Sequence, residues 1–482
     1  MIHLLFVLLI LLFCQGCDIK GANDPFSYAP SSSHSVWNPP AKARKRLPYE
    51  DMHKDLEDYT EFSKEQPLTL AEIIDIALFY NPSTKISWAN ARISAAEYGQ
   101  SLQNNFIQAD IDASYLRTRY AQFTGRERSI VYETQYGGEL QLTYLILDFG
   151  QTRTTSEAAL QSLFNADWSH NSQIQVTIQT LMNDYYNYLY QKQLLYSAEQ
   201  DVINAKVSLD ATQERFQRGL ADVSDIVQAK TSYLQQKLNV VTQKQSLHTS
   251  YTQLINDMGL PPDKPIFFQD YPGKIETFEL EDLDVLVLKA NHNRPDLLAA
   301  EAEVKSSELS FKAARLMNFP TINGEFDIGR KYYQRGVNDH YDFTATVSLD
   351  YPLFQGFFIE NTIKQAKATL ENSKAQLEQV QLSIIQEVSN YRSDVGYARE
   401  SLQYAQAYLE SAEEDYKVNL AKYKVGTGTI VDLINAQTAV ADARAKLATA
   451  QNSWYTSVAN LAYATGILLP PQTQDRYEKT YH

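Results

Sequence analysis

The feature that most constrains this chain is a long stripe of apolar and small residues. Its members recur at steps of four and three, interrupted only at Asn419: Ile384, Val388, Tyr391, Val395, Ala398, Leu402, Ala405, Leu409, Ala412, Tyr416 and Tyr423. A mean spacing of 3.5 residues keeps one side of a helix against a partner helix, as a coiled coil requires. An earlier segment repeats at every seventh position: Ile174, Leu181, Tyr188, Leu195, Val202, Leu209 and Phe216. Two helices of roughly 95 Å cannot fit inside a compact globule, so the sequence predicts an elongated protein.

Composition limits what such a chain can bind. The chain has 482 residues and a formal net charge of -15 at pH 7, which argues against the phosphates of nucleic acid as a partner. The sequence shows no Ser-His-Asp, Cys-His or metal-ligand spacing. We therefore expect neither an enzyme nor a bound metal or cofactor.

Residues 1–16 are predicted to be an export signal. Residues 4–13 are an unbroken apolar run, too short to span a membrane as a helix but typical of a signal peptide. The following Gly16-Cys17 resembles a bacterial lipoprotein cleavage site, which implies a lipid on Cys17. An ordinary cleaved signal with incidental cysteines is the alternative. Residues 17–67 are rich in Pro, Ser and charge, which predicts an extended, lipidated tether.

The remainder of the chain contains two related copies. Asn81-Pro82 is matched by Arg294-Pro295, and Phe216-x-x-Gly219 followed by Asp225 is matched by Tyr423-x-x-Gly426 followed by Asp432. We predict repeats over residues 68–266 and 267–471, and a tail over 472–482. Each repeat is expected to hold a helix, a strand pair, and two long helices joined by a tight turn.

Alternating apolar and polar residues predict the strand pairs, over 106–146 and 320–354. The alternation covers 107–115, 139–146, 322–328 and 343–351. Strands of about ten residues with one apolar face suit a tilted crossing of a bilayer, although a soluble sheet with one wet face shows the same pattern. Four strands cannot close, and lipid does not tolerate an open edge. Three copies would supply twelve strands, enough for a barrel with an open lumen.

The predicted fold class is therefore a mixed α+β membrane protein. It combines a long coiled-coil helical tunnel with four strands per chain in a trimeric, twelve-stranded transmembrane β-barrel. The polar strand face would give an anionic lumen, lined by Asp110, Asp112, Glu139, Glu325, Asp327 and Asp350. Tyr144, Tyr351 and Phe354 lie near strand ends and suit an aromatic girdle at the lipid boundary.

This doubled plan resembles the outer-membrane efflux protein family of TolC-like channel tunnels, and within it the lipoprotein branch of drug-efflux ducts. The resemblance covers about residues 68–470. It rests on Leu68-Thr-Leu-Ala, Ala77-Leu78, Asn81-Pro82, and Tyr423-x-x-Gly426 with Asp432 leading into Ala436-Gln437. It implies a homotrimer in outer-membrane lipid, continued by a tunnel across the periplasm, that exports small molecules and drugs passively. The implied partners are a periplasmic adaptor protein and an inner-membrane pump.

The turns between the long helices are the predicted adaptor-docking tips: Arg218, Gly219 and Leu220 in one, and Val425, Gly426 and Thr427 in the other. A glycine turn leaves backbone groups uncovered, which a partner hairpin can capture.

The resemblance also implies a periplasmic gate at Asp225, Tyr423 and Asp432. Three copies of Asp432 held together would repel one another unless a cation or proton intervened. Gly428 stands where one branch of the family carries a linking Arg, and Asn435 stands where that branch has a second Asp. We therefore expect a gate with fewer polar ties and one acidic ring, held by apolar neighbours such as Leu433.

Two other functions fit parts of the pattern. The exit duct of a type I protein secretion system has the same architecture. A structural coiled-coil protein of the cell surface would explain the helices but leaves the duplicated strands without a purpose.

Overall fold

A computed structural model describes residues 66–263, 265–271, 278–333 and 341–468. The predicted signal peptide, Cys17, the C-terminal tail and nearly all of the tether lie outside these residues. The chain divides into two compact units, Met1–Pro67 with Lys264–Phe268, and Leu68–Asp263 with Gln269–His482. Every helix and strand described below belongs to the second unit.

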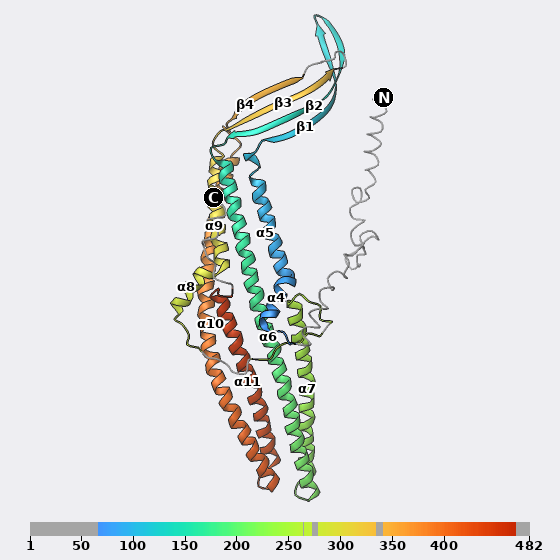
Figure 1. Cartoon of the computed structure of the whole chain (residues 1–482), viewed down its shortest axis with the longest axis vertical. Helices are drawn as coiled ribbons and strands as arrows, with labels where there is room; N and C mark the ends of the chain where they lie inside the picture. Colours follow the sequence, from blue (N-terminus) through green and yellow to red (C-terminus); the bar gives the residue numbers. More distant parts are fainter. Residues whose placement is uncertain (1–65, 264, 272–277, 334–340, 469–482) are drawn as a thin grey trace. The chain divides into compact units, whose positions relative to one another are not determined.

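One order of elements occurs twice in this unit (Figure 1): a helix pair, a strand pair and a pair of long helices. The first copy consists of α4 (Leu70–Tyr80), α5 (Pro82–Ser101), β1 (Gln108–Thr124), β2 (Glu127–Leu147), α6 (Gln151–Gln217) and α7 (Val223–Asp257), with the short 3-10 helix η4 (Gln103–Asn105) before β1. The second consists of α8 (Leu283–Asn293), α9 (Pro295–Leu316), β3 (Thr321–Tyr333), β4 (Asp342–Asp350), α10 (Phe358–Val425) and α11 (Ile430–Ala464). The predicted order of helices and strands is therefore present in both halves.

Capping residues explain where several helices begin. Thr69 and Glu72 form a capping box at the start of α4. The Asn81 side chain accepts a hydrogen bond from the Ser83 amide, and Pro82 occupies the first position of α5. The first amides of a helix lack partners within the helix, so side chains of these types favour a start at these positions.

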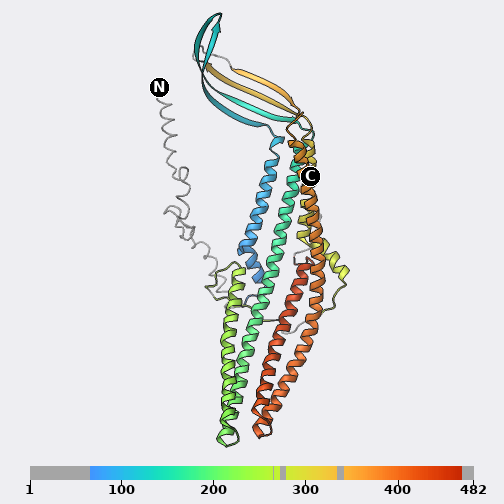
Figure 2. The same ribbon diagram turned by 180° about the vertical axis from the view of Figure 1, so that it is seen from behind.

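The two longest helices, α6 and α10, have 67 and 68 residues, which corresponds to about 100 Å each at 1.5 Å per residue. α7 returns along α6 and α11 along α10 (Figure 2). The predicted stripe is largely buried along α10, including Ile384, Val388 and Val395. Within the described ranges, no helix combines the length and apolar character needed to cross a membrane.

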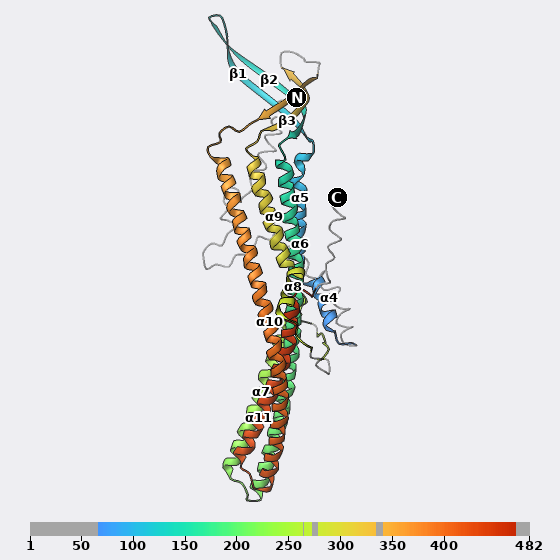
Figure 3. The same cartoon turned by 90° about the vertical axis from the view of Figure 1, so that its left-hand side faces the viewer.

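The four strands form one antiparallel sheet in the order β1-β2-β3-β4. β2 leads into α6 and β4 leads into α10, so the sheet lies at one end of the long helices and their turns lie at the other (Figure 3). Gly150 and Gly356, with φ of +90° and +60°, occupy these strand-to-helix bends. Positive φ costs a glycine little, so glycine suits these bends.

The predicted strand length is wrong for the first pair. β1 has 17 residues and β2 has 21, and they pair without a break from Gln108↔Thr143 to Thr124↔Glu127. Pairing of β2 with β3 reaches only Gln135↔Tyr333, so residues 116–134 form a two-stranded hairpin beyond the four-stranded part. A two-residue turn closes it with Gly125 at φ +64°, as a type II′ hairpin turn requires.

Candidate functional site at the helical tips

The candidate site is the end of the unit where the turns α6–α7 and α10–α11 lie. Gly219 and Gly426 have φ of +69° and +88°, so each turn relies on a conformation that favours glycine. The residues predicted as docking tips are all exposed: Arg218, Gly219, Leu220, Val425, Gly426 and Thr427. Leu220 and Val425 are 63% and 76% exposed, which leaves one large apolar side chain uncovered on each turn.

Tyr423 connects α10 to α6. The ring is 1% exposed, and its hydroxyl donates a hydrogen bond to Thr212 Oγ1 at 3.1 Å. Thr212 in turn donates to the Ser208 carbonyl at 2.8 Å. A buried phenol needs a hydrogen-bond partner, so this chain of hydroxyls fixes the tyrosine between the two helices. Tyr423 therefore links two hairpins of one chain, within which its ring is enclosed.

Arg215 is the residue that joins the two turns. Its Nη1 donates to the Tyr423 carbonyl at 2.8 Å and its Nη2 donates to the Leu220 carbonyl at 3.0 Å. The guanidinium also lies 4.4 Å from the centre of the Tyr423 ring, within the range of a cation–π interaction. One side chain from α6 thus satisfies a carbonyl at the end of α10 and another in the α6–α7 turn.

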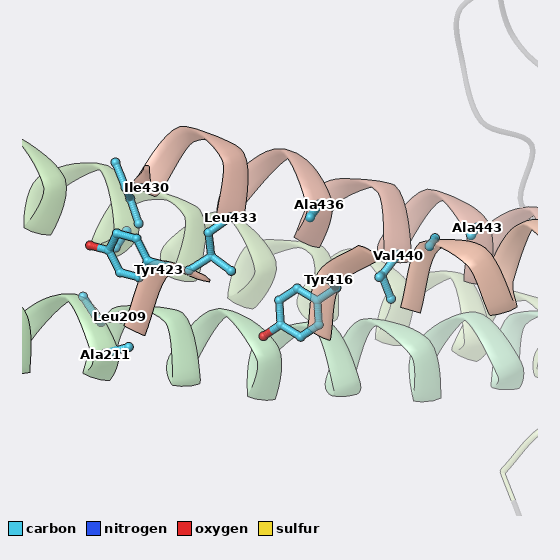
Figure 4. Packing of buried hydrophobic residues seen from close by; sticks show 11 residues of the cluster. Leu209, Ala211, Tyr416, Tyr423, Ile430, Leu433, Ala436, Val440 and Ala443 are labelled. Carbon is cyan, nitrogen blue, oxygen red and sulfur yellow. The ribbon is translucent and has the colours of Figure 1, made fainter. Parts of the chain in front are cut away.

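An apolar cluster extends from this link along the helices (Figure 4): Leu209, Ala211, Ala229, Ala412, Tyr416, Tyr423, Ile430, Leu433, Ala436, Val440 and Ala443. Leu433 is 0% exposed. Leu433, expected among the apolar neighbours that hold the gate, thus packs between the helices of one chain. The heptad step that places Leu433 on the seam of α11 also turns it into the packing between the helices.

The two predicted gate carboxylates cap the returning helices. Asp432 accepts hydrogen bonds from the Thr429 hydroxyl at 2.6 Å and the Thr429 amide at 3.2 Å. These bonds to Thr429 hold the pKa of the exposed Asp432 below its ordinary value, because they stabilise the charged form. Asp225, which is half-buried, accepts from the Asp222 amide at 3.3 Å in the equivalent capping box of α7.

The sequence showed that Gly428 replaces an expected Arg, but it did not reveal Arg215. Arg215 belongs to the hairpin of α6 and α7 and links the two tips. The sequence also did not reveal a second polar link along the body. There the Arg444 guanidinium on α11 donates to Asp201 on α6 at 2.9 Å and to Glu413 on α10 at 3.1 Å. For both arginines, the sequence offered only the residue type as a sign of an ion pair or hydrogen bond, because their partners lie far away in the chain.

At the other end of the unit, the strand register places the six predicted lumen carboxylates on one face of the sheet. Asp112 pairs with Glu139, Gln141 with Asp110 and Asp327, Thr143 with Glu325, and Thr321 with Asp350. Glu139 forms an ion pair with Lys331 at 2.9 Å, and Glu325 accepts a hydrogen bond from Gln141. The remaining carboxylates leave this face strongly anionic.

Comparison with known proteins matches both halves of the unit. The family model described as "Outer membrane efflux protein" matches residues 77–260 and 286–467. The chain is 24% identical to Protein CyaE of Bordetella pertussis over 63% of this chain and 64% of that protein, so it spans a little under two thirds of that relative. It is 23% identical to Outer membrane protein TolC of Salmonella enteritidis over 84% of this chain and 83% of that protein.

Among solved structures, the fold is similar to that of the outer-membrane channel OprN. The TM-score is 0.76 at 19% identity, over 82% of this chain and 89% of that chain.

Proposed function

Because the chain belongs to the outer membrane efflux protein family, as its sequence predicted, we propose that it is the passive exit duct of a tripartite efflux pump. Family membership places the protein in the outer membrane, with its helices in the periplasm. Small molecules and drugs would pass through it without chemical change. The energy would come from an inner-membrane pump, reached through a periplasmic adaptor.

The observation that carries the proposal is the form of the sheet. All strand carboxylates lie on one face: Asp110, Asp112, Glu127, Glu133, Glu139, Glu325, Asp327, Asp342 and Asp350. The other face is apolar over the four-stranded part, and β1 and β4 are edges within one chain. Such edges are not stable in lipid. Three copies, each joining β1 to β4 of a neighbour, would close twelve strands around an anionic, water-filled lumen.

At the far end of the helices, the tips suit both docking and gating. Exposed Leu220 and Val425, beside open glycine turns, offer the apolar contact and backbone groups that an adaptor hairpin would use. Asp225 and Asp432 keep negative charge at the tips. Threefold symmetry would gather their copies into a ring that binds cations and restricts the opening.

Two predictions stay open to experiment. A lipid on Cys17 would add an anchor to the outer membrane, and mass spectrometry of the mature protein can detect this lipid.

A secretion duct would share this architecture. Gene linkage to an ATP-driven exporter, instead of a drug pump, would distinguish it. A purely structural coiled-coil role would leave the two-faced sheet without a purpose.

The test of the duct is a planar-bilayer recording of the purified, detergent-extracted protein. We predict stable, cation-selective channels, because the carboxylates on one face of the sheet would line the lumen. The absence of any conductance from correctly inserted protein would overturn it.

A further inference from the structure

The sheet carries all of its carboxylates on one face and its strand arginines on the other. The face opposite the carboxylates, here called the outer face, carries Ile111, Leu142, Ile328 and Val347. Register places four arginines on this outer face: Arg117, Arg119, Arg128 and Arg330. No Asp or Glu of the four strands shares it. Chance alternation would put carboxylates and arginines on both faces, so the arrangement indicates different environments for the two faces.

A row of tyrosines ends the apolar part of the outer face. Tyr115 pairs with Tyr136, and Tyr136 pairs with Tyr332. The rings of Tyr136 and Tyr332 stack at 5.4 Å between centroids. Tyrosine at this position is typical of the boundary between hydrocarbon and head groups. The row lies at the end of the sheet away from the helices, so in the proposed barrel it would mark the outer leaflet.

Arginines follow directly beyond this row, on the hairpin formed by residues 116–134. Arg119 pairs with Tyr132 and Arg128 pairs with Phe123. The guanidinium carbons of Arg117 and Arg119 lie 5.8 and 5.9 Å from the centre of the Tyr132 ring. The hairpin continues past β3 and β4 (Figure 1), so in the proposed barrel these side chains would stand at the depth of the lipid head groups.

These cations have no carboxylate to neutralise them. All three are exposed, and among the described residues none of Arg117, Arg119 and Arg128 forms an ion pair. Like charges on one face of a strand pair repel each other, so the grouping costs stability unless an anion joins it. Arginine binds phosphate with two parallel hydrogen bonds and tolerates partial desolvation.

From this placement we propose that Arg117, Arg119, Arg128 and Tyr132 form a binding site for the phosphate groups of outer-leaflet lipids, here called the arginine patch. The site rests on the proposed function, because only a barrel in the outer membrane brings the outer face against lipid. The fatty chains would lie on the apolar band below the tyrosines, and the phosphates would contact the guanidinium groups above them. A bound lipid would thus fix the depth of the barrel and cover the charged hairpin.

The test measures binding of fluorescent lipid A, which carries two phosphates, to the detergent-extracted full-length oligomer. The variant R117Q/R119Q/R128Q removes the patch. The matched control K230Q/K244Q/R399Q removes three exposed cations from the helices. We expect roughly 100-fold weaker binding for the patch variant and a change below twofold for the control. Millimolar inorganic phosphate should not displace the lipid.

Three results would overturn the proposal: unchanged binding by the patch variant, an equal loss in the control, or displacement by inorganic phosphate. R119Q alone, expected to bind about fivefold more weakly, provides the same test if the triple variant does not assemble. Conductance in phosphatidylcholine bilayers separates this site from the proposed function. The patch variant should conduct like the natural chain there, whereas failure of every protein to conduct would remove the duct itself.

Discussion

The Tyr423 hydroxyl of α10 donates a hydrogen bond to Thr212 Oγ1 of α6 at 3.1 Å, and this contact joins the two helical hairpins of one chain at their tips. Arg215 covers the same tyrosine ring and holds a carbonyl of each turn. The tips are thereby fixed to each other before any second subunit is added. If the tips form the proposed gate, we expect its opening to require that this link loosens.

Replacement of Arg215 by Gln should loosen the tips. The change removes two charge-assisted hydrogen bonds to carbonyls and a cation–π contact, each of which contributes on the order of 1 kcal/mol or more. We expect at least a twofold rise in single-channel conductance. R218Q is the matched control, because Arg218 is exposed on the same turn, and it should conduct like the natural chain. Equal conductance of R215Q and the natural chain would show that this link does not restrain the opening.

Neutralising Asp432 should weaken the cation-binding ring. D432N keeps an oxygen that can accept the capping bond from Thr429 but removes the charge. We expect a smaller reversal potential in a salt gradient and at least tenfold weaker block by a trivalent cation added on the side of the tips. E410Q, which removes an exposed carboxylate from α10, should change neither quantity. If D432N left selectivity and block unaltered, Asp432 would have no place in the gate.

Charge placed on the apolar tips should prevent docking. L220D and V425D put a carboxylate where an adaptor hairpin would bury an exposed apolar side chain, and desolvating an unpaired charge is costly. We expect binding of the purified cognate adaptor to the immobilised oligomer to fall at least tenfold, with conductance retained. F79D alters a residue that is 67% exposed on α4 and should bind the adaptor normally. Normal adaptor binding by both tip variants would move the docking surface elsewhere.

Stability should fall as the pH rises because of Asp184 on α6. Burial, together with the carboxylate of Asp257 at the end of α7, raises the pKa of Asp184 to about 8, against an ordinary value of 3.8. The folded state therefore holds a proton that the unfolded state releases, so the stabilisation is complete below about pH 4 and is lost as the pH rises towards 8.

The variant D184N should abolish this trend. Thermal unfolding of the detergent-extracted protein is measured at pH 5, 7 and 9. The melting temperature of D184N should rise relative to that of the natural chain as the pH increases. D394N removes an exposed carboxylate from α10 and serves as the control. A difference in melting temperature between the natural chain and D184N that stayed the same at every pH would contradict the assigned pKa.

The sequence could be interpreted where a pattern of residue types repeats along one helix or strand, or recurs in both copies. The heptad positions from Ile384 predicted a long buried seam, and alternation predicted which strand residues share a face. The glycine turns were visible for the same reason, since Gly219 and Gly426 recur in both copies. Thr429 and Asp432 also have the spacing of a capping box, so the capping role of Asp432 could have been found.

What sequence could not supply depends on contacts between distant segments. Arg215 on α6 meets Tyr423 on α10 only because the hairpin of α10 and α11 packs against α6, mainly through α11. No periodic pattern identifies one arginine among many as the partner. The length of the first hairpin was missed because arginines such as Arg117 and Arg119 interrupt the apolar alternation. Both arginines nonetheless belong to β1, because the pairing of β1 with β2 continues without a break at these positions.

We propose that four two-faced strands per chain become stable only when neighbouring subunits complete a cylinder. The most direct test is the mass of the full-length protein extracted in detergent, measured by native mass spectrometry. The account predicts a complex of three chains that persists in detergent and dissociates on heating. A single chain that stays folded and dispersed in buffer without lipid or detergent would contradict it.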